Sequence, residues 1–146
     1  MKIVTLTIAI FFVQCFAAKA QYSAETISSI EWVAFDDEEL NAFGIGMEVT
    51  ANSTIINFKT IYDENRILVA QMPYYLLSYV PMQFDNSFVG KSSSGKYLIM
   101  DCSHTPSDGT VNEGAFIVLE IVKLNATEMY LKGDTGYMRK YKPKQK

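Results

Sequence analysis

Cys102 and His104 are the residues best suited to nucleophilic or metal-binding chemistry. The chain has 2 cysteines and 1 histidine, and a cysteine nucleophile needs a base such as histidine within reach. Asp101 and Asp108 add carboxylates to the same neighbourhood, but a zinc site uses three or four ligands with supporting hydrogen bonds. Because no third catalytic group accompanies the pair, a small buried thiol is the more ordinary interpretation of Cys102. We therefore expect no enzyme activity, no metal and no cofactor.

Acidic residues are the next candidates for chemistry. Residues 36–39 form a run of four acids, Asp-Asp-Glu-Glu, which could bind Ca²⁺ or a basic partner. The same run could be a solvated loop or the first turn of a helix, where acids complement the helix dipole. Glu120 lies in an apolar stretch that we expect to be a strand. It could be a buried acid with a raised pKa and a catalytic role, or it could face solvent opposite Lys132. The sequence has no phosphate-binding glycine loop, nucleophile elbow or zincin helix.

Aromatic side chains are frequent after residue 20. Three of the 9 phenylalanines precede residue 21, which leaves sixteen aromatic residues, including all 9 tyrosines. An eight-stranded barrel has an interior just wide enough for its own side chains or for one small ligand. The side chains expected to line such a cavity are Met47, Phe58, Tyr97, Ile99 and Tyr130, with Tyr75 and Tyr79 at its mouth. The alternative is that these side chains simply fill a core, which strand alternation does not distinguish.

The first twenty residues have the pattern of a secretory signal peptide. Lys2 gives a positive start, residues 3–18 form an almost unbroken apolar run, and Ala18 and Ala20 are small residues placed for cleavage. The run is shorter than the roughly 20 residues that span a bilayer. We therefore expect cleavage near Ala20, export to the periplasm or the extracellular space, and no membrane span. Cys102 would then be the only cysteine of the exported chain.

Without residues 1–20 the chain is more acidic than the whole sequence. The whole chain has 13 basic and 16 acidic residues, a net charge of −3. Two lysines precede residue 21, and five of the remaining basic residues lie between residues 139 and 146. Residues 21–138 therefore carry six basic against sixteen acidic residues. Such an acidic body excludes a basic nucleic-acid-binding protein and suits a basic protein partner.

Alternation of apolar and polar residues predicts strands through most of the chain. Residues 21–142 should form a single domain, followed by a basic, disordered tail at 143–146. Residues 36–43 would be a single helical turn or a loop, and residues 63–66 a hairpin loop. The pattern predicts an all-β fold, an antiparallel meander of about eight strands that closes as a barrel, with a β-sandwich as the alternative. The expected strands are 27–35, 45–50, 55–62, 67–71, 84–89, 96–103, 115–124, 128–132 and 137–142.

Two prolines set residues 74–80 apart. Pro73 and Pro81 flank an apolar, aromatic stretch that contains three tyrosines. Proline cannot donate to a strand ladder, so prolines at both ends predict an edge strand or a lid across an opening. Exposed tyrosines are also common at protein interfaces.

The order of these parts resembles a lipocalin-like (calycin-type) barrel, particularly the small secreted versions found in Bacteroidetes. Trp32 lies early on the first expected strand, hairpins follow, and residues 116–121 and 128–131 precede a last strand that carries Tyr137-x-Arg139. The resemblance implies that Trp32 packs near Arg139 at the barrel floor, a guanidinium over an indole. The sequence departs from the family at Ile30, where the family has glycine.

Two functions fit these observations. The resemblance implies an exported, non-enzymatic protein that holds a small apolar ligand in its barrel. The alternative is an exported protein-interaction module, such as an inhibitor, an immunity-like protein or a surface-assembly component, acting through residues 74–80 or the acidic loop 36–39. Asn52 and Asn125 each begin an Asn-x-Thr sequence that fits an N-glycosylation acceptor, which matters only if the source glycosylates exported proteins.

Overall fold

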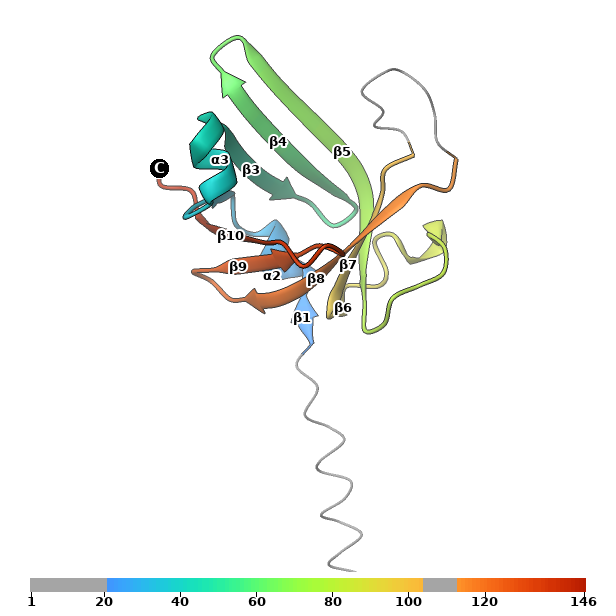
Figure 1. Ribbon diagram of the computed structural model, residues 1–146. Coiled ribbons are helices and arrows are strands. Elements are labelled where there is room, and N and C mark those ends of the chain that lie inside the picture. The colour runs from blue at the N-terminus through green and yellow to red at the C-terminus, as the bar shows by residue number, and fades with distance from the viewer. Residues whose placement is uncertain (1–20, 104–112) are drawn as a thin grey trace, which may run out of the picture.

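Within residues 21–103 and 113–146, which the computed structural model describes, eight antiparallel strands close into a barrel (Figure 1). The strand order is β10-β2-β3-β4-β5-β7-β8-β9, so neighbours in the barrel follow one another along the chain, and β2 pairs with β10 to close it. The predicted all-β barrel is confirmed, and the β-sandwich alternative is wrong. The expected signal segment, His104 and Asp108 lie outside the described residues.

The barrel strands follow the sequence pattern closely. They are β2 (Trp32–Ala34), β3 (Gly46–Ala51), β4 (Ile55–Asp63), β5 (Arg66–Leu77), β7 (Tyr97–Asp101), β8 (Phe116–Leu124), β9 (Met129–Lys132) and β10 (Met138–Pro143). Outside the barrel, β1 (Tyr22–Ser23) pairs with β6 (Ser94–Gly95). The short helices are α2 (Ala24–Ser28), α3 (Glu38–Phe43) and the 3₁₀ turn η1 (Asn86–Phe88). Asp63 pairs with Arg66, so the tight turn between β4 and β5 consists of residues 64 and 65.

The first expected strand, residues 27–35, is only partly a strand. Its beginning belongs to α2, because the Ser23 side chain caps the helix by accepting from the backbone N–H of Glu25. Ile27 is fully buried, and the Trp32 indole N–H donates to the Ile27 carbonyl oxygen at 3.0 Å. Ile27 and Trp32 belong to the same buried cluster as the inward residues of the strands. This end of the barrel is therefore closed by α2, while α3 lies beyond the other end of β2.

The expected edge strand at residues 74–80 is not formed: residues 74–77 are the end of the long barrel strand β5, and residues 78–80 lie in the connection after it. β5 runs through Pro73, pairing with β4 up to Pro73 and with β7 from Tyr74 onward. The Tyr74 N–H donates to the Thr54 carbonyl oxygen at 3.1 Å, so the preceding nitrogen, that of Pro73, faces away from β4. Because the ladder to β7 starts only at Tyr74, the missing N–H of Pro73 breaks no hydrogen bond of the sheet.

A second, smaller apolar cluster covers the outer face of the same strands. Tyr75, Leu77 and Ile99 are buried there against the connection between β5 and β7, in which Phe84 lies 4.9 Å and Phe88 5.4 Å from the Tyr75 ring, centroid to centroid. Residues 84–89, expected as a strand, contain the 3₁₀ turn η1 instead, because the Asp85 side chain caps this turn and the two phenylalanines pack on Tyr75. The barrel wall is consequently apolar on both faces at this place.

The C-terminal residues are held more firmly than the sequence predicts. Pro143 belongs to β10, and the Lys144 N–H donates to the Glu31 carbonyl oxygen at 2.7 Å. The Lys144 ammonium lies 3.1 Å from a carboxylate oxygen of Glu48. The tail expected to be disordered from residue 143 is therefore anchored as far as Lys144.

Candidate functional site

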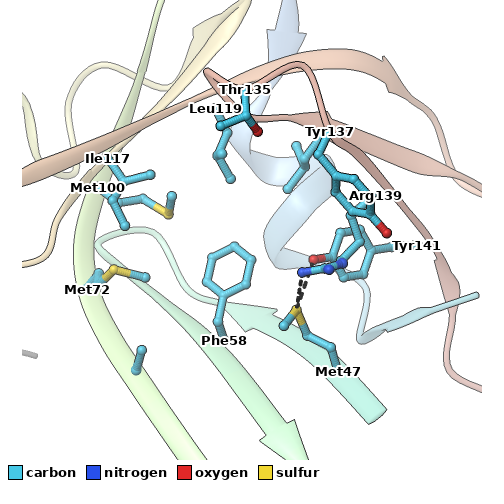
Figure 2. Close-up of a pocket in the computed structure, with 13 residues that line it drawn as sticks. Met47, Phe58, Met72, Met100, Ile117, Leu119, Thr135, Tyr137, Arg139 and Tyr141 are labelled. Carbon is cyan, nitrogen blue, oxygen red and sulfur yellow. Dashed lines mark hydrogen bonds between the residues drawn. The ribbon is translucent and has the colours of Figure 1, made fainter. Parts of the chain in front are cut away.

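A cavity of about 430 Å³ opens within the barrel (Figure 2). It lies at the end where the turn between β9 and β10 contributes Gly133 and Thr135, and where Asp37, the N-cap of α3, contacts Arg139. Strands β3 to β5 and β7 to β10 contribute its walls, and their inward side chains are mainly apolar. The lining residues are Met47, Phe58, Ala70, Met72, Met100, Ile117, Leu119, Leu131, Gly133, Thr135, Tyr137, Arg139 and Tyr141. Three of the lining residues, Met47, Met72 and Met100, are methionines, whose flexible side chains adapt readily to irregular shapes.

Below the cavity the barrel is filled. Trp32, Val49 and Ile56 are fully buried and pack with Ile27 of α2 in the main core. The interior therefore divides into a solid base at the α2 end and a cavity at the α3 end. The cavity thus has a floor of packed side chains.

Met47 and Phe58 are the expected cavity residues that the structure places in the cavity wall. Tyr97 and Ile99 belong instead to the outer cluster, because their neighbours Leu98 and Met100 point inward and adjacent residues of a strand face opposite sides. Their expected place in the cavity was wrong.

The remaining expected cavity residues also lie outside it. Tyr75 is buried in the outer cluster, where its hydroxyl accepts from the backbone N–H of Asp85 at 3.0 Å. Tyr79 lies in the connection after β5 with 57% of its surface exposed. Tyr130 faces outward on β9, where Lys123 and Lys140 lie 5.3 and 5.5 Å from its ring centroid. Tyr75 and Tyr130 do not line the pocket because Tyr74, Met129 and Leu131 take the inward positions on β5 and β9, and Tyr79 lies beyond the end of β5.

One member of the acidic run, Asp37, is buried at the cavity mouth. It caps α3, since its Oδ1 accepts from the backbone N–H of Leu40 at 3.0 Å, and it is only 5% exposed. The same oxygen accepts from the Tyr137 hydroxyl at 2.7 Å, and Oδ2 accepts from Arg139 Nε at 2.7 Å. A second acid, Glu39, lies 3.5 Å from Arg139 Nη2. The solvated interpretation of this run is therefore wrong for Asp37, while the helical-turn interpretation is confirmed.

These contacts fix the charges at the mouth. Burial favours the neutral form of Asp37, but the hydrogen bonds from Arg139, Leu40 and Tyr137 outweigh burial and hold its pKa below the ordinary value. Burial likewise opposes the charge on Arg139, yet the Asp37 carboxylate raises the pKa of the guanidinium. The pair therefore stays ionised across the physiological pH range.

Two donors converge on the sulfur of Met47. Arg139 Nη1 donates to Met47 Sδ at 3.6 Å, and the Tyr141 hydroxyl donates to the same sulfur at 3.4 Å (Figure 2). Tyr141 is almost completely buried, and burial raises the pKa of its hydroxyl, so it remains a neutral donor. Sequence reasoning missed Arg139 and Tyr141 as pocket residues, although their alternation on the last strand puts both on the same face.

The expected stacking of Arg139 on Trp32 is not formed. In the register of β2 and β10, Trp32 lies opposite Pro143, four residues beyond Arg139. The guanidinium carbon lies instead 5.3 Å from the centroid of the Tyr137 ring, beside Asp37. Trp32, on β2, therefore lies in the filled base, whereas Arg139, on β10, lies at the cavity mouth.

The other candidates for chemistry have structural roles. Glu120 lies opposite Lys132 on the outer face of β8, and its carboxylate is 3.1 Å from the Lys96 ammonium. Cys102 follows β7 and packs against the main core. Asn52 and Asn125 each accept backbone hydrogen bonds within their turns, between β3 and β4 and between β8 and β9. In the described part of the chain, no group of three or more His, Cys, Asp or Glu residues could hold a metal ion.

Comparison of the chain with protein-family models, with curated proteins and with solved structures finds no match. Among residues 21–103 and 113–146, no helix has the length and apolar character needed to cross a membrane.

Proposed function

We propose that this protein is an exported, lipocalin-like, non-enzymatic binding protein that holds a small apolar ligand in its barrel. The observation that carries the proposal is the cavity of about 430 Å³ inside a closed eight-stranded barrel. Ligand pockets typically measure about 300–1,000 Å³ and are lined by apolar side chains with a few polar groups that fix orientation. Here most of the lining side chains are apolar, among them Phe58 and Leu131. The polar side chains around Arg139 lie together on one side of the cavity.

The charges at the mouth support binding over catalysis. A general acid or base works best with a pKa near the operating pH. Asp37 has a lowered pKa and Tyr141 a raised one, so both keep a single protonation state near neutrality. Arg139 is held by the two acids beside it. This cluster positions a ligand without exchanging protons with it.

Filling the cavity tests the proposal. Ala70 lines the cavity, whereas its neighbour Val69 on the outer face of β5 is exposed. We expect Ala70→Phe to weaken binding of N-phenyl-1-naphthylamine, a neutral dye that fluoresces in apolar surroundings, by tenfold or more. Val69→Phe, the matched control, should bind the dye like the wild-type protein. Equal dye binding by both variants and the wild type would place the ligand outside the cavity and contradict the proposal.

The native ligand can be sought directly. Native mass spectrometry of the protein purified from its own host should show a retained mass of small-molecule size. That mass should be missing from the Ala70→Phe variant and present in Val69→Phe.

Protein interaction stays as a second candidate because of one exposed apolar strip. Tyr79, Val80 and Met82, in the connection after β5, are 57%, 58% and 99% exposed. The first half of the predicted segment, Tyr74 to Leu77, is buried and offers no surface. A protein-sized mass in the same spectra, lost in Met82→Ser but retained in Ala70→Phe, would favour this function over ligand binding.

A further inference from the structure

The polar side of the cavity contains an unusual acceptor. A thioether sulfur is a weak hydrogen-bond acceptor, yet Met47 Sδ receives both Arg139 Nη1 and the Tyr141 hydroxyl. Buried donors with poor acceptors lose much of the free energy that a good hydrogen bond contributes. Two donors therefore point at one place in the cavity wall where a better acceptor would be favoured.

The methionine at this place can move. Its side chain has three rotatable bonds and fits irregular spaces easily, and it lies at the start of β3 beside the cavity mouth. Both donors, by contrast, are fixed. Arg139 is held through Nε by Asp37, and Tyr141 is packed in the main core. A ligand atom could displace the Met47 sulfur without any rearrangement of the donors.

The charge around the donors selects against an anion. Arg139 carries one positive charge, but Asp37 lies 2.7 Å and Glu39 3.5 Å from its nitrogens. The cluster of one arginine and two carboxylates thus has a net charge of about −1. A ligand carboxylate beside Arg139 would share the guanidinium with the buried Asp37 and the exposed Glu39, and the repulsion comes mainly from Asp37, because exposed charges are screened by solvent.

From these contacts we infer that the ligand is a neutral, apolar molecule with one acceptor oxygen, such as a ketone or an ester. Its oxygen takes the place of Met47 Sδ between Arg139 Nη1 and the Tyr141 hydroxyl, and its apolar body lies against Phe58 and Leu119. This inference rests on the proposed ligand-binding function and adds the chemical class of the ligand.

Three probes with the same ring system test this class: naphthalene, 2-acetylnaphthalene and 2-naphthoate. We expect the ketone to bind about tenfold tighter than naphthalene in isothermal titration calorimetry, because a net hydrogen bond of ordinary strength gives a factor of this order. The carboxylate should bind more weakly than the ketone. Tightest binding by 2-naphthoate would overturn the inference, since it would reveal an anion site.

Variants separate the oxygen contact from the apolar contact. Tyr141→Phe should reduce the affinity for 2-acetylnaphthalene by about three- to tenfold and leave that for naphthalene unchanged. Tyr130→Phe, on the outer face, is the matched control and should change neither. Met47→Leu removes the competing sulfur, so the ketone should bind as tightly as to the wild type or more tightly.

A second readout follows the methionine itself. In spectra of protein carrying ¹³C-labelled methionine methyl groups, the Met47 signal, assigned by its loss in Met47→Leu, should shift more with the ketone than with naphthalene. If naphthalene and the ketone bind equally and Tyr141→Phe changes neither, only the inference about ligand class fails. If none of the three probes binds the folded wild-type protein, the inference about ligand class fails; if N-phenyl-1-naphthylamine does not bind either, the proposed function fails with it.

Discussion

Asp37 joins the helix α3 to the last strand through a single carboxylate, and two substitutions separate its contributions. Asp37→Asn keeps an oxygen that can accept from the Leu40 N–H and the Tyr137 hydroxyl, but it removes the charge opposite Arg139. Asp37→Ala removes the oxygen as well. Comparison of the two variants therefore measures the ion pair and the cap separately.

The expected losses of stability follow from burial. Breaking a buried ion pair by removing one partner costs about 3–5 kcal/mol. The Arg139 side chain is 21% exposed and keeps Glu39 as a second partner, so we expect about 2 kcal/mol for Asp37→Asn. Loss of the cap adds about 1 kcal/mol and loss of the Tyr137 acceptor about 1 kcal/mol, which gives about 4 kcal/mol for Asp37→Ala.

The effect of pH has a definite sign. Despite its burial, Asp37 has a pKa below the ordinary value of 3.8 because Arg139, Leu40 and Tyr137 donate to its carboxylate. A carboxyl with a lowered pKa in the folded chain contributes stability above its unfolded pKa, and loses that contribution as pH falls through the folded pKa. The difference in stability between the wild type and Asp37→Asn should therefore be constant from neutral pH to about pH 5, and smaller at about pH 3.

Urea denaturation at neutral pH, at about pH 5 and at about pH 3 measures these losses of stability. Glu39→Gln serves as the control, because the Glu39 side chain is 61% exposed and an exposed pair contributes less than about 1 kcal/mol. An Asp37→Asn variant with the same unfolding midpoint as the wild type would refute the ion-pair argument. A difference that persists unchanged at low pH would refute the assignment of the lowered pKa.

Three further predictions test the architecture. Ile27→Ala, in the helix that closes the barrel, should cost about 3 kcal/mol of unfolding free energy in urea denaturation, because the side chain is fully buried; a loss below about 1 kcal/mol would mean that α2 does not seal the base. Tyr79→Ala should leave the melting temperature nearly unchanged, and a large drop would place Tyr79 in a core. Gly95→Ala should lower the melting temperature strongly, because an added Cβ would lie 2.3 Å from the Leu77 carbonyl carbon, whereas Gly46→Ala, with its nearest atom at 3.7 Å, should be mild; equal melting temperatures would contradict the close approach of β6 to β5.

The sequence was sufficient to predict the architecture because barrel strands obey a simple local rule. The expected hairpins of β3 with β4 and of β4 with β5 reappear, since alternation along these strands determines which residues can pair and face inward. The prediction of the first strand was wrong in its first half, where a helix forms instead. The Ser23 side chain caps this helix, and Ile27 packs in the core against residues distant in the sequence. Neither contact is visible in a window of local alternation.

The cavity residues were harder to predict for a physical reason. On β7 both faces are apolar, because Phe84 and Phe88 cover the outer one, so the sequence alone does not reveal whether Tyr97 or Leu98 points inward. The polar cluster is equally non-local. Asp37 and Arg139 are about one hundred residues apart in sequence, and only closure of the barrel between β2 and β10 brings them together.

The long strand β5 passes from one environment to another along its length. Its first four residues, Arg66 to Val69, are exposed, while its last four, Tyr74 to Leu77, are buried. Amide hydrogens at the buried end, between two apolar clusters, should exchange with solvent only on global unfolding, and those at the exposed end through small local openings. We therefore expect the hairpin of β4 and β5 to open locally while the base stays folded, which would let the proposed ligand enter without loss of the barrel.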